Sequence, residues 1–141
     1  MKDMASNRAH LEELLQSLLH ASCFRFSKDL QAKLPDRRGI YAISVGDGDD
    51  TRFLWIGITP KSKGGLRRRI YEDHYLNPTS TSDLPNVLRR FKPSLARKDA
   101  RHLIEDKCRV RWIELEDKTE RELLEHYAIA LLQPNPEVGV E

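Results

Sequence analysis

The side chains that could do chemistry in this sequence lie in four short motifs. Gly-Ile-Tyr occupies residues 39–41, Trp-Ile-Gly residues 55–57 and Leu-Arg-Arg-Arg-Ile residues 66–70, while Glu125 stands nine residues before Pro134. An arginine can hold a phosphate through two parallel hydrogen bonds and keeps its proton at all relevant pH values. A carboxylate can bind a magnesium ion whose other ligands are water and phosphate oxygens. These are the residue types that chemistry on phosphate esters requires.

The charge of the chain is concentrated in its middle third. The net charge of the 141 residues is only +2, but residues 60–111 carry fourteen basic and six acidic side chains, a net charge of +8. Residues 112–141 carry two basic and eight acidic side chains. A basic segment is expected of a surface that meets phosphates, and a solvated face whose acids come from elsewhere in the fold is the alternative.

Composition excludes several classes of protein. Hydrophobic residues make up 39% of the chain and charged residues 33%. No apolar run reaches the roughly 18 residues that cross a bilayer, so we expect one globular domain outside the membrane. Cys23 and Cys108 are the only cysteines, which excludes a disulfide framework and a four-cysteine zinc site. A reducing cytoplasm is the expected location.

Hydrophobic patterns indicate the elements that must position the motifs. Residues 39–45 and 53–58 are rich in β-forming residues and flank a loop of glycines and aspartates, so they should pair as an antiparallel hairpin. Charged and apolar residues alternate over residues 109–114, which predicts a third strand with one wet face. Helical spacing predicts helices over residues 8–21, 66–75, 84–91, 95–106 and 120–132.

These elements predict an α/β fold, with a small, mostly antiparallel three-stranded sheet flanked by helices. Residues 1–34 should form an N-terminal helical extension. Residues 35–141 should form the single globular unit that carries all four motifs.

The four motifs, in this order and with this pattern of strands and helices between them, resemble the GIY-YIG nuclease domain. The resemblance covers roughly residues 35–136. The family includes homing endonucleases, some restriction enzymes, the incision subunit of bacterial excision repair and junction-resolving nucleases. The resemblance implies a metal-dependent endonuclease that hydrolyses phosphodiester bonds in DNA, with Mg²⁺ or Mn²⁺ as cofactor.

The resemblance also assigns roles to individual residues. Tyr41 matches the tyrosine that helps to deprotonate the attacking water, Arg69 the arginine that holds the scissile phosphate, and Glu125 the single metal-binding glutamate. His74 matches the histidine or tyrosine that the family often places about one turn after that arginine, although it follows Arg69 by five residues, not four. Either arginine of residues 67–68 could be the phosphate ligand instead.

Further basic residues should contact the phosphate backbone of DNA independently of sequence and with a strong dependence on salt. Two lysines that follow the second strand could also favour the phenolate form of Tyr41, whose ordinary pKa of about 10 makes it a weak base. The candidates for nucleic-acid binding are Lys61, Lys63, Arg67, Arg68, Arg89 and Arg90.

The second motif begins with Trp55 where the family has tyrosine, which keeps a large aromatic ring and loses the hydroxyl. Two other interpretations stay open: a nucleic-acid-binding module that kept the fold and lost turnover, and a protein-interaction domain. DNA specificity would come from residues 76–106, the N-terminal helix, a homodimer or a partner subunit. We expect Tyr41, Arg69 and Glu125 to converge on one face of the sheet around a solvent-open cleft.

Overall fold

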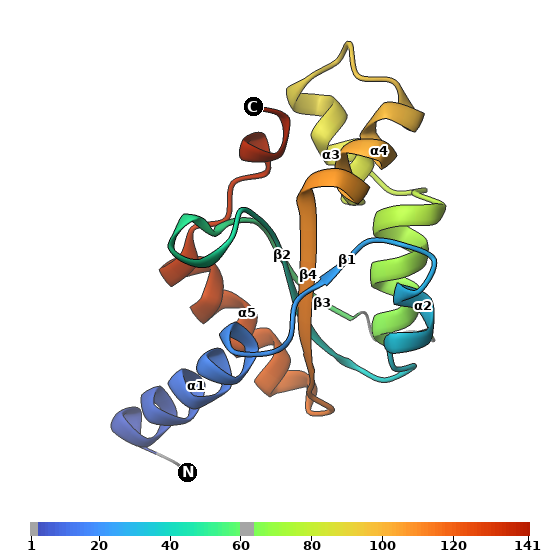
Figure 1. The fold of residues 1–141 in the computed structure, drawn as a ribbon. Helices are drawn as coiled ribbons and strands as arrows, with labels where there is room; N and C mark the ends of the chain where they lie inside the picture. Colours follow the sequence, from blue (N-terminus) through green and yellow to red (C-terminus); the bar gives the residue numbers. More distant parts are fainter. Residues whose placement is uncertain (1–2, 60–63) are drawn as a thin grey trace.

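A four-stranded antiparallel sheet of order β1-β4-β2-β3 lies at the centre of the molecule (Figure 1). The computed structural model describes residues 3–59 and 64–141. The sheet has one strand more than the three predicted, because β1 spans only two residues and is too short to leave an alternating pattern. The strands are β1 (Phe24–Arg25), β2 (Gly39–Val45), β3 (Arg52–Ile58) and β4 (Cys108–Glu114).

The hairpin of β2 and β3 brings the first two motifs side by side. Tyr41 pairs with Gly57 and Ile43 pairs with Trp55. Directly opposed residues of an antiparallel pair point to the same face, and so do residues two apart in one strand. Tyr41, Gly57 and Trp55 therefore share one face of the sheet.

Helices cover both faces of the sheet (Figure 1). α1 and α5 lie against one face, α2 and η2 against the other, and α3 and α4 stand at one end beside η3. Within the described residues, no helix is long and apolar enough to cross a membrane. The helices are α1 (Met4–Leu19), α2 (Leu30–Lys33), η1 (Gly48–Asp50), η2 (Arg67–Leu76), α3 (Leu84–Phe91), α4 (Arg97–Lys107), α5 (Lys118–Leu132) and η3 (Pro136–Val140).

Strand β2 divides the interior into two cores. All seven of its residues are buried, and successive side chains point to opposite faces. Tyr41 packs in the core beneath η2, together with Ile70. Ile40 packs in the core beneath α1 and α5, together with Leu124. The two cores fix which helices can reach the Tyr41 side of the sheet directly.

The N-terminal segment is packed into the same unit as the motifs. In addition to α1, it supplies strand β1, which pairs with β4. Phe26, Leu30 and Leu34 are each at most 2% exposed and belong to the core that contains Tyr41. Residues 24–34 therefore help to form the wall behind η2.

Candidate active site

Helix η2 carries the basic residues nearest to Tyr41 and has π-type hydrogen bonding, in which each N–H reaches back five residues instead of four. At its end, Asn77 N donates to Glu72 O at 2.7 Å. The wider turn allows Arg69 and His74, five residues apart, both to contact the Tyr41 hydroxyl. The spacing of five residues between Arg69 and His74, where the GIY-YIG family has four, thus fits a π-type helix, whose turn is about one residue longer.

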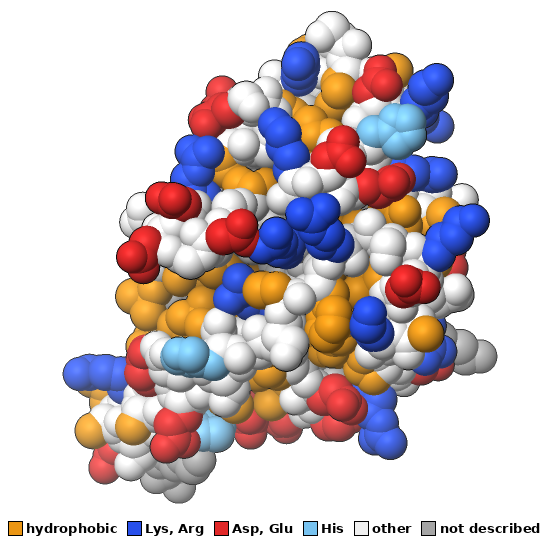
Figure 2. All heavy atoms as spheres, in the orientation of Figure 1, with side chains coloured by type: hydrophobic (Ala, Val, Ile, Leu, Met, Phe, Trp, Pro, Cys, Tyr) orange, Lys and Arg blue, Asp and Glu red, His pale blue; other side chains and the backbone are white. Residues whose placement is uncertain are grey.

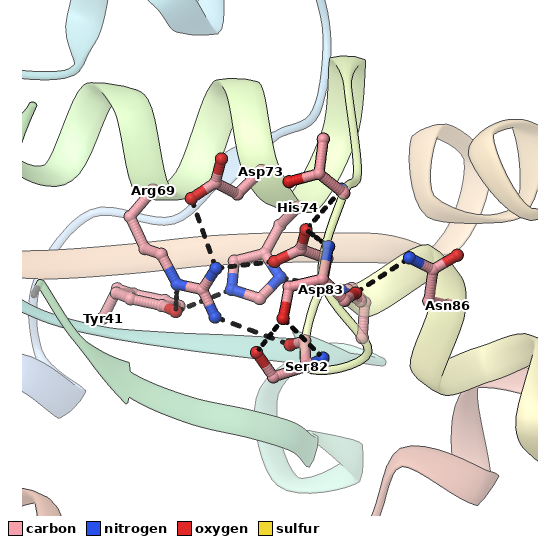
Figure 3. Close-up of polar contacts among 10 residues, drawn as sticks. Tyr41, Arg69, Asp73, His74, Ser82, Asp83 and Asn86 are labelled. Atoms are coloured by element: carbon pink, nitrogen blue, oxygen red, sulfur yellow. Dashed lines mark hydrogen bonds and ion pairs between the residues drawn. The ribbon is translucent and has the colours of Figure 1, made fainter.

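The hydroxyl of Tyr41 is the centre of a group that we call the Tyr41 cluster: Tyr41, Trp55, Arg69 and His74. Figure 3 shows how Arg69 and His74 meet at this hydroxyl. His74 Nε2 lies 2.6 Å from Tyr41 Oη, and Arg69 Nε donates to the same oxygen at 3.1 Å. The indole N–H of Trp55, which can only donate, is near enough to this hydroxyl to lower its pKa. Trp55 therefore supplies a hydrogen-bond donor at the position where the GIY-YIG family, which the sequence resembles, has the hydroxyl of a tyrosine.

Gly57 leaves the space that this contact needs. A Cβ at residue 57 would lie 2.4 Å from Tyr41 Oη and 3.1 Å from Trp55 Nε1. Any side chain there would therefore displace one of the two groups. Packing alone therefore explains why residue 57 of the second motif is a glycine.

The backbone of α3 sets the tautomer of His74. Leu84 N donates to His74 Nδ1 at 2.8 Å, so we assign the proton of the neutral ring to Nε2, which then donates to Tyr41. His74 is fully buried, and this burial, with the charge of Arg69, holds its pKa well below the usual 6.5. The N–H groups of His74 and Arg69 consequently both donate to one phenol oxygen.

Burial dominates the acidity of Tyr41. Loss of hydration raises its pKa to about 12, although the charge of Arg69 and the hydrogen bonds from Arg69 and Trp55 lower it. Tyr41 is 0% exposed, so the expected solvent-open cleft does not include its hydroxyl. The physical reason is that β2 is an inner strand covered by helices on both faces.

Two carboxylates hold Arg69. Its Nη1 lies 2.7 Å from Asp83 Oδ1 and 3.3 Å from Asp73 Oδ2. Asp83 is 1% exposed, and its Oδ2 accepts the backbone N–H groups of Thr79 and Ser80, each at 2.7 Å. The guanidinium is thus fixed against the loop before α3, and Nη2 is its least engaged nitrogen.

Neither of these two carboxylates was predicted as a partner of Arg69. Asp83 stands directly before α3, a position where aspartate ordinarily caps a helix. Its carboxylate instead accepts hydrogen bonds from Arg69 and from the backbone of the preceding loop. The signal for Asp73 was present, because residues four apart on a helix often form ion pairs. No comparable signal links Asp83 to Arg69, fourteen residues earlier.

Glu125 lies on α5. Its neighbour Leu124 packs with Ile40 on the face of the sheet opposite Tyr41, so the helix that carries Glu125 covers that opposite face. The spacing of apolar residues fixes the buried side of α5 but not the sheet face on which the helix lies. The carboxylate is nevertheless close enough for its charge to raise the pKa of Tyr41.

The Glu125 carboxylate suits a cation that keeps most of its water. It is half-buried, burial raises its pKa, and no described residue forms a hydrogen bond or ion pair with it. Over residues 3–59 and 64–141, no group of three His, Cys, Asp or Glu side chains could hold a metal ion. A single carboxylate fits Mg²⁺, which commonly uses one or two protein carboxylates together with water and phosphate oxygens.

Among the described residues, the other candidate basic residues do not join the Tyr41 cluster. Arg67 Nε donates to Leu34 O at 3.0 Å, and Arg89 Nε donates to Leu95 O at 2.9 Å. Of the three consecutive arginines, only Arg69 contacts Tyr41. Arg68 and Arg90 are exposed, whereas Lys61 and Lys63 lie outside the described residues.

A search against models of protein families and a search of curated proteins found no match for this chain.

Proposed function

We propose that this protein is a metal-dependent endonuclease of the GIY-YIG type, which hydrolyses phosphodiester bonds in DNA. The observation that carries the proposal is the Tyr41 cluster, with the unpaired Glu125 carboxylate in electrostatic range. Burying a guanidinium and an imidazole around a phenol strips water from polar groups. A core made of apolar side chains does not carry this cost in free energy. Perturbed titrating groups gathered in this way are typical of functional sites.

In the proposed reaction, a water oxygen bonds to phosphorus while the bond from phosphorus to the 3′ oxygen breaks. Arg69 would bind the phosphoryl oxygens through Nη2, where its charge stabilises the transition state. The departing 3′ oxygen takes up a proton from solvent. A divalent cation at Glu125 would add positive charge beside the phosphate and the leaving oxygen.

Tyr41 would accept the proton of the attacking water, and for this it must first lose its own proton to solvent. An ionised phenol oxygen has three lone pairs: two would accept the N–H groups of His74 and Arg69, and the third would take the proton of the water. Because the charge of Glu125 raises the pKa of Tyr41, neutralising that charge lowers it. Cation binding at Glu125 and activation of Tyr41 are therefore coupled.

A second candidate function, a nucleic-acid-binding module without turnover, is favoured by one specific observation. Tyr41 is 0% exposed, and Arg69 Nη1 already contacts two carboxylates. A nuclease must open a path from Tyr41 Oη to water, whereas a binding module need not. Trp55, which lies near the Tyr41 hydroxyl and stands where the GIY-YIG family has tyrosine, is the residue whose substitution separates the two candidates.

The experiment is a cleavage assay with the full chain on duplex, nicked, branched and single-stranded DNA, in Mg²⁺, Mn²⁺ or EDTA. Metal-dependent cleavage by the wild type supports the nuclease. An inert wild type together with an active Trp55→Tyr variant supports the binding module. If neither protein cuts and neither binds DNA, both candidates are wrong.

A further inference from the structure

A basic pocket of about 580 Å³ lies between the end of η2 and the first turns of α4. Among the described residues, no carboxylate side chain lines it. Its remaining lining comes from residues 75–79 and Pro85. The charged and titratable side chains that line it are Arg97, Lys98, Arg101 and His102. We call this cavity the basic pocket.

The basic residues occupy one stripe of α4, since positions i, i+1, i+4 and i+5 of a helix lie on neighbouring sides. Arg97 and Lys98 stand in the first turn, where the helix dipole disfavours positive charge. Ala96, which precedes the helix, has no side chain that could cap the free N–H groups. Asp99, also in the first turn, offsets part of this unfavourable charge, and a bound anion would offset more of it.

One of the cations is held in place before any ligand binds. Arg101 Nη2 donates to Leu76 O at 2.6 Å, and its guanidinium carbon lies 6.0 Å from the centre of the Tyr75 ring. Among the described residues, no other hydrogen bond engages this guanidinium. A pre-positioned guanidinium loses less side-chain freedom when it binds a planar pair of phosphate oxygens.

The basic pocket is joined to the candidate active site by the loop before α3. Thr79 lines the pocket, and its backbone N–H donates to Asp83 Oδ2. The other oxygen of Asp83 holds Arg69. Figure 2 shows Lys and Arg side chains and a histidine at the α3–α4 end of the molecule, with Asp and Glu side chains among them. A nucleic-acid strand could thus meet positive charge at both places.

We propose that the basic pocket is a phosphate-binding site. This inference rests on the proposed function. The pocket would bind an internal phosphate of the DNA strand, and Arg69 would bind the neighbouring phosphate whose ester bond is cut. The pocket would select an oxyanion because Arg101, Arg97 and Lys98 line it and, in the described lining, no carboxylate competes for these cations. The site would align the strand along η2 and leave bond breaking to the Tyr41 cluster.

The first test compares two charge-matched double variants. Arg97→Ala/Lys98→Ala removes two exposed cations from the pocket, and Arg8→Ala/Lys28→Ala removes two exposed cations that do not line it. Binding of a fluorescent duplex is measured by anisotropy between about 50 and 200 mM salt. For the pocket variant, we expect weaker binding and a log–log salt slope that is smaller by about 0.9 for each lost phosphate contact. A pocket variant that binds like the control overturns the inference.

The second test needs no DNA. Inorganic phosphate is titrated into ¹⁵N-labelled full-length protein at constant ionic strength, and the Nε–H resonance of Arg101 and the backbone N–H of Lys98 are followed. We expect saturable shifts in the wild type and none in Arg97→Ala/Lys98→Ala; no shift in the wild type overturns the site. Phosphate binding by a wild type that binds no DNA refutes the proposed function alone. DNA binding that both double variants retain refutes the pocket alone.

Discussion

Removal of the Asp83 carboxylate should destabilise the protein strongly. Asp83 is 1% exposed and accepts three N–H groups, from Arg69 Nη1, Thr79 and Ser80, each at 2.7 Å. Breaking a buried ion pair by removing one partner costs about 3–5 kcal/mol, because the remaining charge stays buried. Asp73 remains 3.3 Å from the same nitrogen and compensates in part, so we expect a loss at the lower end of that range for Asp83→Ala.

Asp73→Ala is the matched control, since it removes a carboxylate from the same Arg69 nitrogen. The Asp73 side chain is 28% exposed and four residues from Arg69 on one helix, so its loss should cost less than about 1 kcal/mol. In a chain of this size, about 3 kcal/mol lowers the melting temperature by roughly 10 °C. Urea and thermal unfolding would measure both variants. Equal losses for Asp83→Ala and Asp73→Ala would refute the view that a buried ion pair anchors Arg69.

Three further predictions concern titration. Because the pKa of His74 is lower in the folded protein than its ordinary 6.5, the unfolded chain takes up the proton first as pH falls. His74 should therefore cost stability below pH 6.5, by up to about 1.4 kcal/mol per pH unit, and urea unfolding of His74→Gln should lack this slope. Glu125→Gln should lower the pKa of Tyr41 from about 12, which phenolate absorbance measures, with Glu122→Gln as the control. Equal pKa values of Tyr41 in the two variants would contradict the coupling between the charge of Glu125 and the acidity of Tyr41. Trp55→Phe, which removes an N–H donor, should raise that pKa, and a fall would show that hydration matters more than the lost hydrogen bond.

The β2–β3 hairpin could be predicted because both strands have strong local patterns and the loop between them contains glycine and aspartate. The same patterns put Tyr41, Trp55 and Gly57 on one face. Strand β1 could not be predicted, since two residues carry no periodicity. The π-type hydrogen bonding of η2 also leaves no mark in a pattern of apolar residues.

The polar contacts of the site depend on tertiary structure in a way that spacing cannot express. Asp83 reaches Arg69 only because the loop of residues 77–83 folds back on η2. Glu125 lies on a helix whose buried side was readable, but the choice between two apolar sheet faces depends on how α1 and α5 pack together. Sequence motifs thus indicated several of the residues but not how they are held.

Cleavage of DNA by Glu125→Gln tests the proposed activity most directly. Glu122→Gln is the control, because it removes an exposed carboxylate one turn earlier on α5. We expect the wild type and Glu122→Gln to cut in Mg²⁺ or Mn²⁺ but not in EDTA. Glu125→Gln should cut at least about a hundredfold more slowly while binding DNA as well or slightly better, because a carboxylate that repels phosphate is gone. Cleavage by Glu125→Gln at the wild-type rate, or wild-type cleavage in EDTA, would contradict a metal-dependent nuclease with its cation at Glu125.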